Sequence, residues 1–174
     1  MTPDGRPRGA LLVVALACLA ACSAELDWRE FNSPEGRFAV MLPARPSSGS
    51  REVLLAGTKT ALRMVSTQTP GMAFGVGYAD LAPGTDRQRV IAESRDALVR
   101  NINGRVIGER AIETGDARGI EFQAEGTAEG KPMRLAARIL VAGDRFYQVA
   151  LVARAERVAE VDPALFPGSF RLLR

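Results

Sequence analysis

Long stretches of this sequence alternate between apolar and polar residues, and short turn signals separate them. Between residues 131 and 142, for example, Met133, Leu135 and Ile139 share one face at a spacing of two. Gly143-Asp144 then provides a tight turn before a second apolar stretch, 145–153. A spacing of two is the side-chain period of a β-strand, and connections this short join antiparallel neighbours. The pattern therefore predicts a sheet that is mostly antiparallel.

The same signals divide the rest of the chain into strands and two helices. Residues 85–103 show helical spacing, and Thr85 with Gln88 fits a capping box. We expect a shorter helix within 156–173 and a loop at 45–50. The expected strands are 28–32, 37–42, 52–56, 59–67, 72–81, 105–114, 117–125, 131–142 and 145–153. This order predicts an α+β fold, in which a single, mostly antiparallel β-sheet is covered by one long central helix and a short C-terminal helix.

One expected strand, 72–81, has a bulky face and a smooth face. Phe74 and Tyr78 lie on the bulky face, whereas Gly75 and Gly77 lie on the other. We therefore expect something to pack closely against the smooth side. The two glycines are not interpreted as a phosphate-binding loop, because no Lys-Ser or Lys-Thr pair follows them.

The N-terminus carries the most specific motif. Two arginines precede an apolar run over residues 10–21, which is too short to cross a bilayer but typical of a signal peptide. The run ends in Leu19-Ala20-Ala21-Cys22, which resembles the bacterial lipobox. The resemblance implies cleavage between Ala21 and Cys22 and lipid attachment at Cys22. The alternative is an ordinary secretory peptide that is cut after an Ala-x-Ala-like site.

These signals divide the chain into a signal peptide (1–21), a short tether (22–27) and a single α+β domain (28–174). Two or three acyl chains would anchor the protein firmly in a membrane. In Gram-negative lipoproteins, an aspartate directly after the lipidated cysteine retains the protein in the inner membrane, whereas a serine sends it to the outer membrane. By this analogy, Ser23 implies the outer membrane. We expect a cell-envelope protein on the periplasmic face of that membrane. It should lie close to the lipid, because five tether residues reach at most about 17 Å.

Several motifs in the region 28–172 follow the order of a known class of proteins. They are the opening Trp28 and Phe31, the stretch 33–40, Leu42-Pro43, Pro46, Arg145-Phe146-Tyr147 and the closing Phe166, Ser169 and Phe170. In this order the region resembles the PsbP/DcrB-like class of small α/β/α sandwich proteins. The resemblance implies that architecture, together with accessory, assembly or binding roles and no shared catalytic apparatus.

The sequence contains no histidine. Serine and cysteine hydrolases that use a histidine base are therefore excluded, and so are histidine-ligated metal sites. The carboxylates Asp80 and Asp86, and the group Glu109, Glu113 and Asp116, are interpreted as solvated surface residues. The dense acidic run of a calcium loop does not occur. We expect no enzymatic activity, no cofactor and no metal.

Arginines on the polar faces of expected strands form a possible basic patch. Arg63, Arg134 and Arg138 would make one stripe if their strands were neighbours, and the stripe could meet anionic lipid or another polyanion. Acidic residues on the adjacent hairpin arm are expected to pair with them: Glu121, Glu125 and Glu129. Nucleic acid is not an expected partner, because the compartment is wrong and the aromatic residues have core spacing.

Two functions follow from these expectations. The first is a membrane-anchored periplasmic lipoprotein that serves as a non-catalytic accessory or binding module of the cell envelope, with an envelope protein as partner. The alternative is a carrier or sensor of a small or lipidic ligand held between sheet and helix. In the alternative, the smooth face at Gly75 and Gly77 would form one wall of the pocket.

Overall fold

A computed structural model describes residues 26–162 and 164–173. The described chain is mostly β, with 59% of its residues in strands. The strands are β1 (Arg29–Ser33), β2 (Phe38–Leu42), β3 (Ser47–Leu55), β4 (Thr58–Thr69), β5 (Met72–Asp80), β6 (Arg105–Thr114), β7 (Ala117–Ala128), β8 (Lys131–Ala142), β9 (Arg145–Arg154) and β10 (Arg171–Leu172). The helices are α1 (Arg87–Asn101), the 3-10 helix η1 (Ala155–Glu160) and α2 (Leu165–Ser169).

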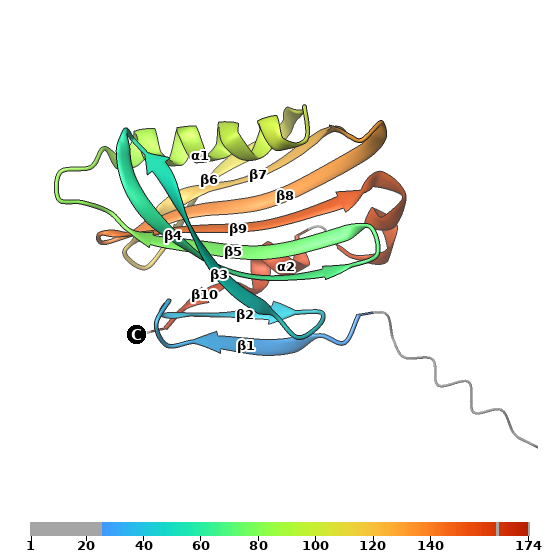
Figure 1. The fold of residues 1–174 in the computed structure, drawn as a ribbon, viewed down its shortest axis with the longest axis horizontal. Coiled ribbons are helices and arrows are strands. Elements are labelled where there is room, and N and C mark those ends of the chain that lie inside the picture. Colours follow the sequence, from blue (N-terminus) through green and yellow to red (C-terminus); the bar gives the residue numbers. More distant parts are fainter. Residues whose placement is uncertain (1–25, 163, 174) are drawn as a thin grey trace, which may run out of the picture.

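The strands form two antiparallel sheets. The large sheet has seven strands in the order β3-β4-β5-β9-β8-β7-β6, and the small sheet has the order β1-β2-β10. Figure 1 shows α1 above the large sheet and the small sheet below it. The central strands β5 and β9 are apolar on both faces, which requires a covering layer on each side.

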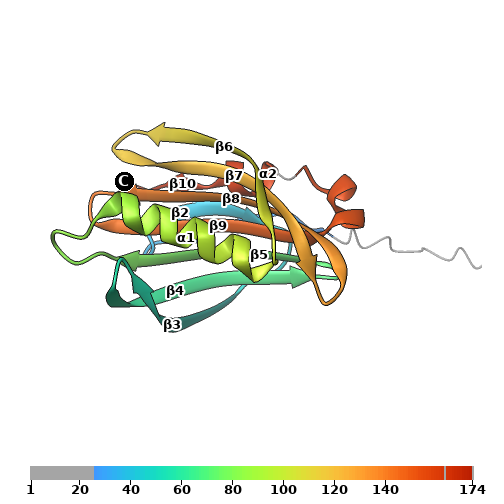
Figure 2. The same ribbon diagram turned by 90° about the horizontal axis from the view of Figure 1, so that it is seen from above.

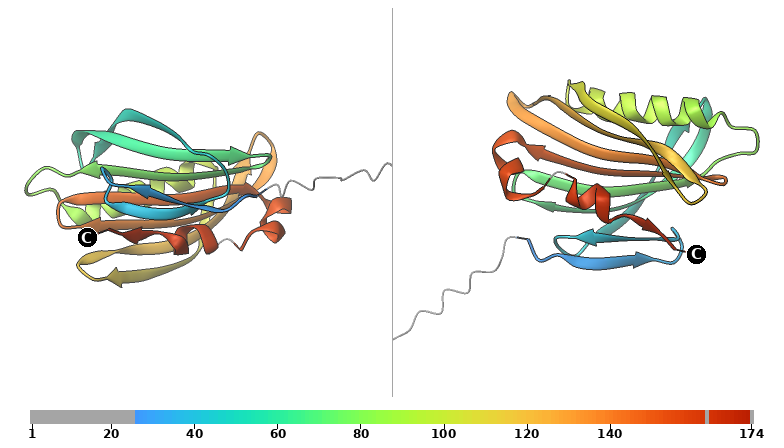
Figure 3. Two further views of the ribbon diagram at one scale, coloured as in Figure 1. Left: turned by 90° about the horizontal axis from the view of Figure 1, so that it is seen from below. Right: turned by 180° about the vertical axis from the view of Figure 1, so that it is seen from behind.

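Each face of the large sheet has its own hydrophobic core. On one face, Val90, Ile91 and Leu98 of α1 pack against β7 and β8, and Figure 2 shows α1 lying obliquely over the sheet. On the other face, Phe38 of the small sheet and Phe170 pack against β5 and β9. From below (Figure 3, left), the yellow β6–β7 hairpin extends beyond the small sheet and α2.

The expectation of a single sheet under one long central helix is wrong. The described chain has two sheets, and its three helices are short. The sequence pattern indicated antiparallel strands correctly, but it did not indicate which strands pair. Pro43 and Pro46 lie between β2 and β3, where the chain passes from the small sheet to the large one, and β2 pairs with the late strand β10 as well as with β1.

Two local expectations are also wrong. Residues 47–50, which were expected in a loop, begin β3. The N-cap of α1 is Asp86 rather than Thr85, since the Asp86 carboxylate accepts a hydrogen bond from the Arg89 amide at 3.1 Å. By contrast, the expected strands 105–114 and 131–142 are confirmed residue for residue.

The smooth face of β5 is covered by a neighbouring strand. A Cβ atom on Gly77 would lie 3.2 Å from the Leu62 side chain of β4, whereas one on Gly75 would lie no closer than 3.9 Å to any neighbour. The main contacts of α1 are with β7, β8 and β3 instead. The expected close approach therefore occurs at Gly77, through Leu62.

The turn between β1 and β2 is clamped to the large sheet by polar groups. The buried Tyr147 hydroxyl donates to the Gly36 carbonyl at 3.0 Å, and Arg145 donates to the Glu35 carbonyl at 2.7 Å. Arg63 pairs with the Glu35 carboxylate at 3.0 Å. Burial raises the pKa of the Tyr147 phenol, so this group stays protonated and can donate. These contacts fix the small sheet against the large one.

Candidate functional site: an arginine ladder on β6, β7 and β8

The three arginines of the expected basic patch do not form one stripe. Arg63 lies on β4, whereas Arg134 and Arg138 lie on β8, with β5 and β9 between these strands. Arg63 is also engaged by Glu35 in the clamp that joins the two sheets. The structure therefore brings Arg134 and Arg138 together and leaves Arg63 apart.

Arg134 and Arg138 belong instead to a ladder of charged side chains across β6, β7 and β8. We call this surface the arginine ladder. Its first rung is Arg105, Glu125 and Arg134, and its second rung is Arg110, Glu121 and Arg138. In each rung a glutamate of β7 lies between an arginine of β6 and an arginine of β8. The expected pairing is confirmed for Glu125 with Arg134 and for Glu121 with Arg138, whereas Glu129 lies in the turn between β7 and β8.

A β-bulge in β6 brings Arg105 and Arg110 onto one face. Residues five apart in a regular strand point to opposite faces. The register shifts between Val106 and Gly108, so one extra residue is absorbed, and Arg105 and Arg110 then oppose Glu125 and Glu121. Reading strict alternation therefore misses both arginines of β6. The signal that could have found them is Gly108, since a glycine inside a strand often marks a bulge.

The first rung is positioned by a close crossing of two backbones. The segment after α1 passes over β7, where the Thr127 amide donates to the Ile102 carbonyl at 2.6 Å. A Cβ atom on Gly126 would lie 2.1 Å from that carbonyl oxygen, so only glycine fits there. Glu125 precedes this contact, and both its carboxylate oxygens accept hydrogen bonds, one from Arg105 and one from Arg134.

The side chains of the second rung are less exposed to solvent than those of the first rung. Arg110 donates to one oxygen of Glu121 through Nε at 3.1 Å and through Nη2 at 2.7 Å. Arg138 donates to the other oxygen. Burial alone would raise the pKa of Glu121, but the hydrogen bonds from Arg110 and Arg138 outweigh it, so the pKa of this carboxyl lies below its usual range. Glu121 is therefore an ion at neutral pH and is unsuited to act as a general acid.

The arginine ladder presents mainly positive charge to solvent. Glu121 keeps 19% of its side-chain surface exposed, whereas Arg110 keeps 66% and Arg105 keeps 75%. Four guanidinium groups face two carboxylates, and in each rung the arginine of β6 is the most exposed of the three side chains. The chemistry that fits this arrangement is the binding of anions through charge-assisted hydrogen bonds.

Hollows in the surface adjoin both rungs. A hollow of about 520 Å³ is lined by residues that include Arg105, Glu125 and Arg134. A smaller one of about 280 Å³ includes Arg110 and Glu121. Each rung therefore offers space for a side chain of a bound partner.

Side chains fill the interface between α1 and the large sheet. The buried residues of α1 and of the sheet beneath it form one hydrophobic cluster. A hollow of about 580 Å³ does occur next to α1, but it lies between the helix and β6 and is lined mostly by charged side chains, among them Arg95 and Glu109. The packed interface gives no support to a ligand between sheet and helix.

Other sequence-based site predictions concern carboxylates and the N-terminus. Asp80 pairs with Arg145, and Glu109 pairs with Arg95 at 3.1 Å. Among residues 26–162 and 164–173, no three Cys, His, Asp or Glu side chains lie close enough to hold a metal ion. No helix within these described ranges is both long and apolar enough to cross a membrane. Ala21 and Cys22 lie outside the described residues.

No protein-family model matches the chain, and no curated protein matches it. Among solved structures, cyanobacterial PsbP (CyanoP) from Synechocystis sp. PCC 6803 superposes with a TM-score of 0.53 at 8% identity, covering 90% of this chain and 98% of that one. The fold is PsbP-like. A Pseudomonas aeruginosa protein of unknown function, described as a putative regulator, gives a TM-score of 0.44 at 12% identity, covering 79% of this chain and 90% of that one.

Proposed function

We propose that this chain is a lipid-anchored, non-catalytic binding module of the bacterial cell envelope. The observation that carries the binding role is the arginine ladder, whose β6 arginines are exposed while the Glu121 carboxyl, with its lowered pKa, is held as an ion. A site built in this way can attract and orient an anion, and Glu121, as a carboxylate, has no proton to donate near neutral pH. A PsbP-like fold is compatible with an accessory role.

The proposed anchor is Cys22, and the fold supports a short connection to it. Leu26 and Trp28 already pack against the core of the domain, and the Asp27 amide donates to the Pro43 carbonyl at 2.8 Å. Four residue steps from Cys22 to Leu26 span at most about 14 Å. A domain held at this distance would stay beside the lipid headgroups.

Intact-mass analysis of the protein purified from membranes tests the anchor. We expect a chain that begins at Cys22 and carries the added mass of two or three acyl groups. Cys22→Ala should lose partitioning into the detergent phase, whereas Cys18→Ala, which changes a residue of the proposed signal peptide, should keep it. A wild-type chain that begins at Met1 and has no acyl mass would refute the proposal.

Density-gradient separation of inner and outer membranes tests the location. The wild type, with Ser23 after the modified cysteine, should be found with the outer membrane. Ser23→Asp should move the protein to the inner membrane, and Ser23→Ala should not. Equal distribution of these three proteins between the membranes would contradict the outer-membrane assignment.

A further inference from the structure

We infer that the arginine ladder recognises an extended acidic segment of a partner protein, with two carboxylates that lie four residues apart. This inference rests on the proposed binding role and names the chemistry of the partner. It does not depend on the lipid at Cys22.

The first step is the charge of the surface. Each glutamate of the ladder is shared by two arginines, so each rung carries one positive charge more than negative. Arg105 and Arg110 are the more exposed arginines, and both come from the edge strand β6. Guanidinium groups bind carboxylates in a planar, two-bonded geometry. An acidic side chain can therefore approach each rung from solvent, at Arg110 from the Nη1 side, since Nε and Nη2 already donate to Glu121.

The second step is the spacing. Glu121 and Glu125 are four residues apart on β7, and so are Arg138 and Arg134 on β8. At about 3.3 Å per residue, the two rungs lie about 13 Å apart along the strands. In an extended segment, residues i and i+4 point to the same side and have the same separation. An α-helix would need carboxylates about nine residues apart to span this distance.

The third step concerns what lies at and between the rungs. A hollow adjoins each rung, and exposed Gln123 lies between them with its partner residues Gly108 and Ala136. Two separate hollows suit two discrete side chains. A lipid bilayer presents a continuous layer of headgroups with no fixed spacing and would not need this arrangement. The observations therefore favour a protein segment over a membrane surface.

The direct test is a titration of the purified full chain with synthetic peptides. The probe is a ten-residue peptide of serines and threonines with glutamates at positions 3 and 7. The first control peptide has its glutamates at positions 3 and 6, which point to opposite sides of an extended chain, and the second has glutamine at both positions. We expect the 3/7 peptide to bind about fivefold more tightly than the 3/6 peptide, which corresponds to one surface ion pair.

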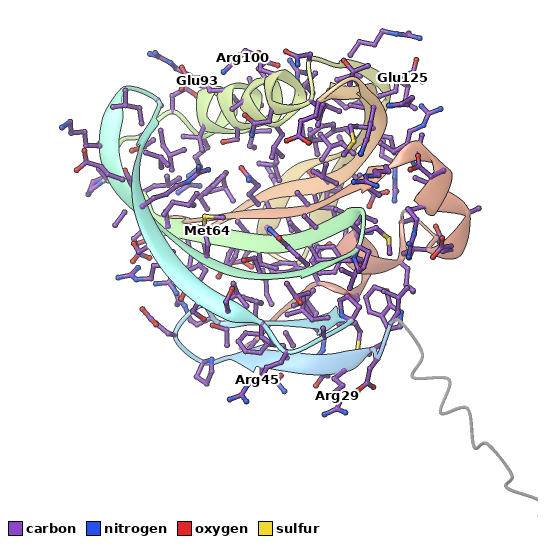
Figure 4. All side chains as sticks on the ribbon, turned by 45° about the vertical axis from the view of Figure 1, so that its right-hand side comes forward. Arg29, Arg45, Met64, Glu93, Arg100 and Glu125 are labelled. Atoms are coloured by element: carbon purple, nitrogen blue, oxygen red, sulfur yellow. The ribbon has the colours of Figure 1, made fainter. Side chains whose placement is uncertain are left out.

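Protein variants test whether the ladder is the binding surface. Arg105→Gln with Arg110→Gln should weaken binding of the 3/7 peptide by at least about fivefold. The matched control is Arg29→Gln with Arg45→Gln, which removes the same charge at the opposite end of the molecule from Glu125 (Figure 4) and should leave binding unchanged. Gln123→Glu removes no existing contact of the ladder and should also weaken binding, since it adds a negative charge between the rungs. Thermal unfolding of each variant checks that it is folded.

Three results would overturn the inference. The first is equal binding of the 3/7 and 3/6 peptides. The second is an equal loss of binding in the Arg29/Arg45 control. The third is a ladder variant that still binds the peptide but loses affinity for vesicles containing phosphatidylglycerol, which would assign the surface to the membrane. Because acylation at Cys22 is measured separately by mass, failure of the peptide to bind would leave the proposed anchor untouched.

Discussion

At the scale of single residues, the second rung of the arginine ladder depends on Glu121 being held as an ion. Glu121 accepts hydrogen bonds from two arginines in a partly buried position, and its pKa is lower in the folded chain than in the unfolded one. Its contribution to stability is therefore fully present above its ordinary pKa of 4.5 and is lost as the pH falls through the lower folded value. The free energy of unfolding therefore depends on whether the Glu121 carboxyl is ionised.

Glu121→Gln should lower the free energy of unfolding by about 1 kcal/mol at pH 7. The difference from the wild type should shrink as the pH falls below 4.5 and through the lower folded pKa of Glu121, because the wild-type carboxyl then becomes protonated in both states. Urea unfolding of the variant and the wild type at pH 7 and at pH 3 measures the difference in their free energies of unfolding. Glu113→Gln is the control, since Glu113 is 71% exposed and its change should be near zero at both pH values. A difference between Glu121→Gln and the wild type that does not depend on pH would contradict this account.

At the scale of elements, β6 shows why strand boundaries could be predicted from the sequence while the face on which a side chain lies could not. The boundaries of β6 and β8 follow from alternation and turn residues, so they could be predicted. The common face of Arg105 and Arg110 depends on one extra residue, which alternation does not reveal. The pairing of β10 with β2 could not be predicted either, because a strand of two residues has no pattern of its own.

Deleting Ile107 should preserve both rungs. Ile107 is the residue that the bulge absorbs, so its removal leaves Arg105 opposite Glu125 and Arg110 opposite Glu121. We expect the thermal midpoint and the binding of the acidic peptide to remain close to wild type. Deletion of Ala111, in the regular part of β6, should instead force Ile112 or the rungs out of register and lower both quantities. Similar behaviour of the two deletions would show that the bulge does not set the register.

At the scale of the whole molecule, the two sheets depend on each other through a small aromatic cluster. The Phe170 ring lies 5.5 Å from the Phe38 ring of the small sheet and 5.3 Å from the Tyr147 ring of the large sheet. Phe170 is buried and directly precedes β10. The C-terminal segment therefore holds the first hairpin of the chain against the large sheet.

Phe170→Ala should cost about 3 kcal/mol of folding stability, because it leaves a cavity between the two sheets. Hydrogen exchange should speed up most in β1 and β2, far away in sequence, and least in β8 and β9. Leu165→Ala is the control, since Leu165 is 50% exposed and its loss should change the unfolding midpoint little. Equal acceleration of exchange in all strands would show that the small sheet does not open separately.

The placement of β2 between β1 and β10 also bears on how the protein is made. A chain that crosses a membrane as an unfolded thread delivers its N-terminal hairpin first, and that hairpin must wait for the last strand before its open edge is closed. Until then the apolar side of the hairpin has no cover. If the chain is exported as proposed above, the interval between the arrival of the hairpin and the arrival of β10 is the period in which a chaperone would matter most.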